Sequence, residues 1–328
     1  MDNLIYSLNC TMPIFLVMAA GYLLRLTGWV NEQFVKTANK LNFNITLPCM
    51  LLLNMLDCDI RHSFDGKYVL YCAGTTMTCI LVIWIGAKFV MRDKSLVGEF
   101  VQGSYRGSAA ILGIALVTNI SGNAGMSSLM MLGSVPLYNI FAVIVLTFEA
   151  VYRTEGEVAA SEKEQRRLAS RAKIRKACIG IAKNPIIISI IGGMLLSYVE
   201  FRLPKIPYKT VDSIGSLTTP LALLAIGAGF EGRKAVKKLK PTLVATFIKL
   251  VVQPAVFLPV AVTMDFGTDK LVAALIMLGA PTTATSYIMA KNMGHEGVLS
   301  ASIVVMTTLL SAFTVTAWVF VLRTWHLI

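Results

Sequence analysis

The sequence predicts an all-α membrane protein with ten membrane-spanning helices, arranged as two five-helix repeats of opposite orientation. Hydrophobic residues make up 55% of the 328 residues, and the mean hydropathy of +0.68 is too high for an ordinary soluble domain. The apolar segments are each close to the roughly 20 residues that a helix needs to cross a bilayer. An internal offset and the distribution of Lys and Arg predict the repeat and its orientation.

Ten apolar segments have a length suited to spanning. They lie near residues 4–26, 36–56, 68–91, 96–119, 126–152, 178–200, 208–230, 241–264, 271–292 and 298–323. The first begins directly after MDN, without the basic region of a cleavable signal peptide, so we expect it to be a spanning helix. The six cysteines form no CxxC pair. We interpret them as small apolar residues rather than as metal ligands or a disulfide framework, and we expect neither metal nor cofactor.

The positive charge of the chain is concentrated in alternate loops. The net charge is +12, which could indicate nucleic acid, but most of the 30 Lys and Arg residues fall in the odd-numbered loops between predicted spans. The positive-inside rule places these loops in the cytoplasm. We therefore expect a multi-pass protein of the cell membrane in contact with the lipid bilayer, with both termini extracellular or periplasmic and with no nucleic-acid partner.

Residues 153–177 form the one long polar insert, RTEGEVAASEKEQRRLASRAKIRKA. We expect a basic linker at the cytoplasmic surface. Its two interpretations are a solvated connector and a regulatory or lipid-binding segment.

The insert separates two halves that resemble each other at an offset of 172 residues. This shift aligns prolines, glycines and an aspartate along the whole half. The pairs are Pro13 with Pro185, Gly21 with Gly193, Pro48 with Pro220, Asp93 with Asp265, Gly107 with Gly279, and Gly122 with Gly294. Residues 1–152 and 178–328 would each hold five spans. Because five is odd, the second half enters the membrane from the opposite side, which gives an inverted repeat.

The stretch 275–294, which covers most of the ninth predicted span, has an unusual centre, GAPTTATSY. Pro281 lacks an N–H and clashes with the preceding turn, so it predicts a break. Hydrocarbon cannot satisfy the freed backbone groups, so a broken helix at this depth is tolerated only inside protein or beside a water-filled cavity. The offset pairs this span with residues 103–122 of the fourth span, which are rich in small residues. The predicted breaks at Gly107, Gly279 and Pro281 indicate a midplane site. The polar candidates for substrate contact around Pro281 are Thr282, Thr283, Thr285, Ser286 and Tyr287.

Arg106 lies near the middle of the fourth span, where a lone charge costs at least about 2.5–3.5 kcal/mol. Glu99 and Gln102 precede it by seven and four residues, so the three share one helix face. One interpretation is that Arg106 binds an anionic substrate with help from Gln102 and Ser108. The other is a structural ion pair with Glu99 or another acid.

A second basic residue, Lys249, lies within the eighth span with Gln253 four residues later, on the same face. Two roles fit: coupling or substrate binding, and a fixed internal charge. Asn44, near Pro48 in the second span, and the matching Pro220 could line a substrate path, or these prolines could simply kink packed helices. Asn139 in the fifth span is a further polar lining candidate.

Catalytic motifs are absent from the sequence. It contains no Walker motif, GxSxG, HExxH or pair of acids within the predicted spans, and its three histidines fall in loops or at the end. These absences argue against an enzyme or an ATP-driven pump.

Three stretches resemble the auxin efflux carrier family of membrane transporters, which includes bacterial permeases for small organic acids. They are NPIIISIIGGMLLS at 184–197, TTPLALLAIGAGF at 218–230, and APTTATSYIMAKNMG followed by LSASIVVMTTLLS within 280–311. The resemblance implies ten spans in an inverted repeat like that of bile-acid symporters and sodium/proton antiporters, with crossed, broken fourth and ninth helices. It also implies a dimerising scaffold of spans 1, 2, 6 and 7, and a transport domain of spans 3–5 and 8–10.

The fourth span departs from the family pattern. Ser108 stands where Asn is expected and Ala115 where Pro is expected, in RGSAAILGIAL. We expect a secondary transporter of a small organic anion, either auxin-like or a mono- or dicarboxylate, that works by elevator-type alternating access as a homodimer. The alternatives are a sodium-coupled symporter of amphipathic anions and a binding or sensor protein that keeps the transporter fold without flux.

Overall fold

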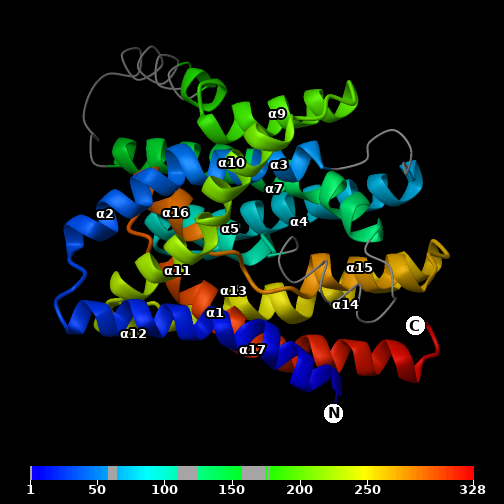
Figure 1. The fold of residues 1–328 in the computed structure, drawn as a ribbon. Coiled ribbons are helices and arrows are strands. Elements are labelled where there is room, and N and C mark those ends of the chain that lie inside the picture. The colour runs from blue at the N-terminus through cyan, green and yellow to red at the C-terminus, as the bar shows by residue number, and fades with distance from the viewer. Residues whose placement is uncertain (1, 58–64, 109–124, 157–174, 176–177) are drawn as a thin grey trace, which may run out of the picture.

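The computed structural model describes the chain except for residues 1, 58–64, 109–124, 157–174 and 176–177. Throughout the described part the regular elements are helices, as expected (Figure 1). The first half contains α1 (Asp2–Leu26), α2 (Glu32–Leu41), the π-helical turn η1 (Asn42–Thr46), α3 (Leu47–Leu56), α4 (Gly66–Val90), the short η2 (Lys94–Leu96), α5 (Val97–Tyr105) and α7 (Gly125–Gly156). The polar insert predicted at 153–177 lies largely outside the described residues.

The second half repeats a similar order of elements. It contains α9 (Pro185–Tyr198), α10 (Lys205–Ser216), α11 (Thr218–Ala228), α12 (Gly232–Lys237), α13 (Leu239–Phe247), the π-helical turn η3 (Ile248–Val252), α14 (Gln253–Thr263), α15 (Thr268–Gly279), α16 (Thr285–Asn292) and α17 (Val298–Thr324).

Five helical stretches of the described chain are long and apolar enough to cross a membrane. They are Gly66–Val90, Leu129–Ala150, Lys205–Ala228, Leu239–Thr263 and Val298–Thr324. Two shorter apolar helices are Met12–Leu26 and Pro185–Tyr198. The chain is thus a helical, membrane-type protein, and the full set of ten spans stays a prediction.

Side-chain caps fix several helix starts at positions that the sequence marks. Asp65 accepts a hydrogen bond from the backbone N–H of Tyr68 at 3.1 Å, and Asn184 accepts one from Ile186 at 2.9 Å, directly before Pro185 at the first helical position. Both satisfy N–H groups that have no partner inside the helix. Lys270 forms an ion pair with Asp65, and this pair together with the Tyr68 N–H holds the pKa of Asp65 below its usual range.

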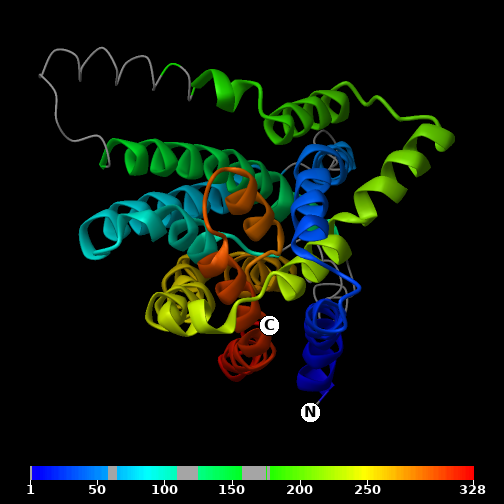
Figure 2. The same cartoon turned by 90° about the vertical axis from the view of Figure 1, so that its left-hand side faces the viewer.

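The helices pack as two neighbouring groups (Figures 1 and 2). In one group α1 packs on α11, and α3 packs on α9 and α10. In the other, α5 lies among α4, α7, α13 and α17, and α15 packs on α14. The short α16 contacts both groups, through α2 and α11 on one side and α5, α7 and α17 on the other. This position makes α16 and the chain leading into it the structural centre of the molecule.

Candidate functional site: two interrupted helices that meet

The fourth predicted span is interrupted at Arg106. Helix α5 ends at Tyr105, and Arg106 leaves the helix with φ −80° and ψ 121°. Gly107 follows in a tight space, since a Cβ there would lie 3.0 Å from the carbonyl oxygen of Met277 and 3.1 Å from Nζ of Lys249. The rest of this span, from residue 109, lies outside the described residues, including Ala115.

The ninth predicted span is interrupted around Pro281. Helix α15 ends at Gly279, α16 begins at Thr285, and Ala280 is extended with ψ 150°. A residue before proline is biased towards this conformation. The side chain of Ser286 donates to the carbonyl of Thr283 at 2.7 Å, which satisfies a backbone group at the start of α16.

The two interruptions are joined by hydrogen bonds. The backbone N–H of Ser108 donates to the carbonyl of Pro281 at 2.8 Å. The Thr282 hydroxyl donates to the carbonyl of Gly103 at 2.7 Å, and the side-chain amide of Gln102 donates to the carbonyl of Ser286 at 2.7 Å. We call residues 106–108 and 280–284, which lie between the helices, together the crossing. These bonds satisfy several of its polar groups within protein, as the membrane interior requires.

Arg106 is buried beside the crossing with neutral partners. Its side chain is 3% exposed, and its guanidinium donates to Oδ1 of Asn139 and to the sulfur of Met289. Within the described part of the chain, no carboxylate lies within ion-pair range of it. Asn139 is oriented by its own amide, which donates to the carbonyl of Val135 at 2.9 Å. Arg106 is therefore a buried cation whose described hydrogen-bond partners are both uncharged.

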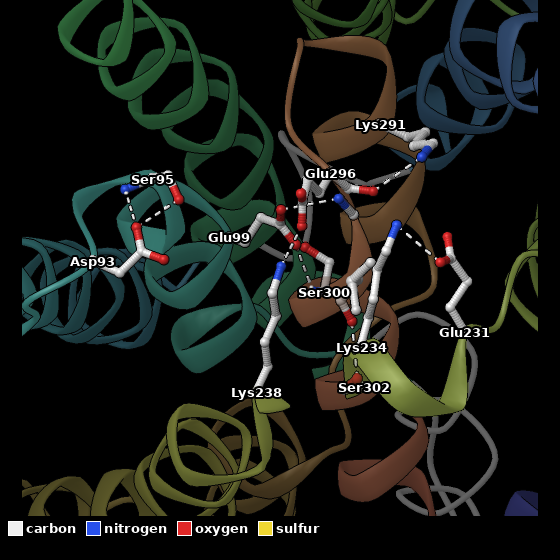
Figure 3. Close-up of polar contacts among 12 residues, drawn as sticks. Asp93, Ser95, Glu99, Glu231, Lys234, Lys238, Lys291, Glu296, Ser300 and Ser302 are labelled. Atoms are coloured by element: carbon white, nitrogen blue, oxygen red, sulfur yellow. Dashed lines mark hydrogen bonds and ion pairs between the residues drawn. The ribbon is translucent and has the colours of Figure 1, made fainter. Parts of the chain in front are cut away.

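Glu99 is engaged elsewhere, which corrects the expectation that it could pair with Arg106. Its two carboxylate oxygens accept the backbone N–H groups of Gly297 at 2.9 Å and Ser300 at 2.8 Å. A carboxylate at a helix N-terminus is favoured by the helix dipole and by the free N–H groups there. Glu99 therefore fixes the start of α17 against α5 (Figure 3).

Lys249 is fully buried and lies between the ends of the two half-helices. Its ammonium donates to the carbonyls of Tyr105 at 3.4 Å, Met277 at 3.2 Å and Leu278 at 2.8 Å, and to Oε1 of Gln253 at 3.3 Å. Tyr105 ends α5, and the other two carbonyls belong to the last turn of α15. Helix C-termini carry partial negative charge, so Lys249 neutralises both ends at once. Gln253 in turn donates to the carbonyl of Ser104 at 2.7 Å.

The remaining predicted residues divide between the crossing and other places. Thr283 and Thr285 lie at the start of α16 with their hydroxyls 3.2 Å apart. The hydroxyl of Tyr287 accepts a long 3.5 Å hydrogen bond from Asn39. Asn44 is exposed and donates to the carbonyl of Lys40 in its own helix, so it lies away from the crossing.

Pro48 and Pro220, which match each other in the two halves, lie in the first turns of helices. Pro48 is at the start of α3, directly after η1, and Pro220 is in the first turn of α11, which follows α10 after the single residue Leu217. The buried amide of Asn42 joins these two places by donating to the carbonyl of Thr218 at 3.0 Å. Helices α10 and α11 both pack on η1 here, and whether the prolines line a substrate path stays a prediction.

Several contacts of the site had no clear signal in the sequence. Met289 and Thr307 belong to apolar stretches, yet Met289 contacts Arg106, and Thr307 accepts the backbone N–H of Thr282 at 3.0 Å. Their roles depend on the fold of distant segments. His295 and Glu149 are also buried but belong to a separate cluster at the ends of α7 and α16.

Comparison with known proteins agrees with this geometry. A family described as "Membrane transport protein" matches residues 7–319. A protein of Rhizobium meliloti (strain 1021) named "Putative malonate transporter" is 22% identical over 326 residues, covering 95% of this chain and 94% of the relative. The match confirms the resemblance to the auxin efflux carriers, and it confirms that the protein is a transporter rather than an enzyme. The chain belongs to the membrane transport protein family of auxin efflux carriers and related permeases.

Proposed function

We propose that the protein is a secondary transporter that carries small organic anions with one or two carboxylates across the cell membrane. The observation that carries this proposal is the position of Arg106, a buried cation beside the crossing whose described partners are a neutral amide and a thioether. A buried charge is costly unless it is paired. A carboxylate substrate would supply the missing charge through the paired N–H groups of the guanidinium.

The crossing supplies groups that suit such a substrate. Thr283 and Thr285 present hydroxyls at the start of α16, and the N-terminus of a helix attracts anions through its dipole. Ser108 and Tyr287 would complete the polar surroundings. Because the named relative is described as a malonate transporter, malonate is the first probe, followed by other dicarboxylates, monocarboxylates and auxin-like acids.

The proposed architecture is the ten-span inverted repeat. Support comes from the helix bounds, because shifting Glu32–Leu56 of the first half by the sequence offset gives 204–228, and α10 begins at Lys205 while α11 ends at Ala228. The same shift of α4 gives 238–262, close to the bounds Leu239 and Thr263 of α13 to α14. The basic linker 153–177 would connect the halves on the cytoplasmic side, with both termini outside.

The proposed mechanism is elevator-type alternating access. The scaffold would consist of α1, α2–α3, α9 and α10–α11, which pack on one another, and would form a homodimer. The other helices would move as the transport domain and carry the crossing. The short α16 contacts both groups, so the substrate would travel along the boundary between them.

Lys249 favours transport without sodium. In a sodium-coupled carrier a bound cation could neutralise the C-terminal ends of the half-helices, and here the ammonium of Lys249 contacts those carbonyls itself. We expect sodium to leave the apparent unfolding temperature of the wild-type protein unchanged relative to choline at equal ionic strength. In Lys249→Ala, sodium should raise it, because the carbonyls lose their donor. Stabilisation of the wild type by sodium would instead support the sodium-coupled alternative.

The decisive experiment is uptake of radiolabelled malonate and an anion panel into proteoliposomes. We expect saturable uptake that competes with unlabelled substrate, and loss of most of it in Arg106→Gln. The matched control is Arg323→Gln, which removes an exposed cation at the end of α17. No transport of any carboxylate would refute the proposal, and saturable binding without flux would support the sensor alternative.

A further inference from the structure

Helix α12 joins the candidate spans Lys205–Ala228 and Leu239–Thr263. It occupies the short connection where one span ends and the next begins, so we expect it at a surface of the membrane. Five basic residues fall within eight positions at this connection and the start of the next span: Arg233, Lys234, Lys237, Lys238 and Lys240. These five basic residues fall into two groups, which differ in whether a carboxylate of the protein pairs with them.

Two of the five cations are paired with carboxylates of the protein. Lys234 forms an ion pair with Glu231 at 2.9 Å, and Lys238 forms one with Glu296, in the segment between α16 and α17. Figure 3 shows the side chain of Lys234, on α12, and that of Lys238, directly after α12, extending towards these carboxylates. The side chain of Lys234 is 54% exposed and that of Lys238 15% exposed, so what the two lysines have in common is pairing with a carboxylate.

The other three cations are exposed. Arg233 and Lys237 are four residues apart, on one face of α12, and Lys240 follows in the first turn of α13. Within the described chain, no carboxylate forms an ion pair with any of the three. These cations therefore face away from the protein without counter-charges of their own.

Exposed apolar side chains lie next to these three cations and indicate the environment that the cations face. Lys240 begins an exposed stripe at helical spacing on α13 that continues with Leu243, Val244 and Phe247, which are 47%, 45% and 58% exposed. On α12 and at the start of α13, Val236 and Leu239 are 72% and 44% exposed. An exposed apolar stripe on a spanning helix is its lipid-facing side. The free cations thus lie at the end of a lipid-facing surface, at the level where lipid headgroups begin.

We propose that Arg233, Lys237 and Lys240 form a binding site for the headgroup of an anionic phospholipid. Basic side chains beside a membrane attract anionic lipids, and the stems of Lys and Arg pack along apolar surface while the charge reaches the phosphate. Val236 and Leu239 would contact the upper acyl chain. A soluble acidic partner would not need exposed valine, leucine and phenylalanine continuous with the cations, so the apolar stripe favours a lipid.

The test compares unpaired with paired cations of this connection at equal change in charge. Purified protein in neutral detergent is titrated with dioleoyl-phosphatidylglycerol or dioleoyl-phosphatidylcholine, and bound lipid is counted by native mass spectrometry. We expect the Arg233→Gln/Lys237→Gln variant to bind phosphatidylglycerol about tenfold more weakly. The control, Lys234→Gln/Lys238→Gln, loses two positive charges that are already paired with carboxylates of the protein and should bind it within about twofold of the wild type.

Two results would overturn the proposal. Equal weakening in both double variants would show a general effect of charge, and unchanged binding in Arg233→Gln/Lys237→Gln would show that no site exists there. Thermal unfolding of each variant checks that it is folded. If the double variant does not fold, Lys240→Gln lies outside α12 and should still weaken phosphatidylglycerol binding about threefold while leaving phosphatidylcholine binding unchanged.

Discussion

Gly107 and Gly279 correspond to each other in the two halves of the sequence, yet alanine should be harmful at Gly107 and tolerated at Gly279. At Gly107 an added Cβ would lie 3.0 Å from the carbonyl oxygen of Met277 and 3.1 Å from Nζ of Lys249. At Gly279 the nearest atoms would be Cγ of Pro254 at 3.5 Å and a side-chain carbon of Leu275 at 3.6 Å, which is ordinary van der Waals contact.

The magnitude follows from what must move. In Gly107→Ala either the crossing or the Lys249 ammonium shifts by a few tenths of an ångström, and Lys249 is held by a 2.8 Å hydrogen bond to Leu278. Overpacking of this kind typically costs about 1–3 kcal/mol. Gly279 is the last residue of α15, where alanine costs no contact and can gain up to about 1 kcal/mol through helix propensity.

The assay measures apparent unfolding temperature and anion uptake for both variants. Gly107→Ala should unfold on the order of a few degrees lower and lose most of its uptake, because the displaced groups hold the two half-helices together. Gly279→Ala should match the wild type in both measurements. Equal losses in the two variants would refute the reasoning, since they would mean that the breaks tolerate side chains alike.

Three further outcomes are expected. Lys249→Met removes a donor to three buried carbonyls. Tyr138 still donates to Met277 at 3.3 Å, but the carbonyls of Tyr105 and Leu278 lose this donor, at about 1–3 kcal/mol each when left without a partner, so the apparent unfolding temperature should fall well below that of the wild type; an unchanged value would contradict this structural role. Pro281→Ala restores an N–H in the ninth span and should reduce anion uptake, and normal uptake would show that other residues make the break. Asp65→Asn keeps a helix cap but loses the Lys270 ion pair, so at pH 7 it should unfold slightly lower than wild type. Because the pair holds the folded pKa of Asp65 below its unfolded value, its contribution is present above about pH 4 and is lost as pH falls through the folded pKa; a difference that persists at pH 2 would exclude the ion pair as its cause.

Local chemistry made part of the fold predictable. Pro281 cannot continue a helix and biases the residue before it towards extended backbone, so the interruption between Gly279 and Thr285 could be expected from the sequence. Arg106 could be singled out because a charge within an apolar span is rare and costly. The start of α9 could be located from Asn184 followed by proline, a pattern that caps and begins a helix.

Other features depend on the packing of distant segments. Glu99 shares a helix face with Arg106 by spacing, yet it caps α17, because the fold brings Gly297 and Ser300 to it. Asn44 looks like a lining residue in a polar stretch, but the π-helical turn leaves it exposed and places Asn42 inward. A change of helix type within one turn alters which side chain faces the core, and hydrophobic periodicity does not reveal it.

The two interrupted helices contribute different groups, although the sequence offset pairs them. The ninth span contributes hydroxyls and a proline, which satisfy freed backbone groups and set the break. The fourth contributes Arg106, and its offset counterpart in the ninth span is the apolar Leu278, so the cation occurs on one side only. Lys249 already neutralises the half-helix ends through carbonyl contacts, so under the proposed function Arg106 is the cation available to a substrate. A carrier built this way would admit one carboxylate at Arg106 and select between mono- and dicarboxylates through the groups around the second end of the substrate. Substitutions at Thr283 or Thr285 should therefore change the preference among anions, while substitutions at Arg106 should weaken all of them.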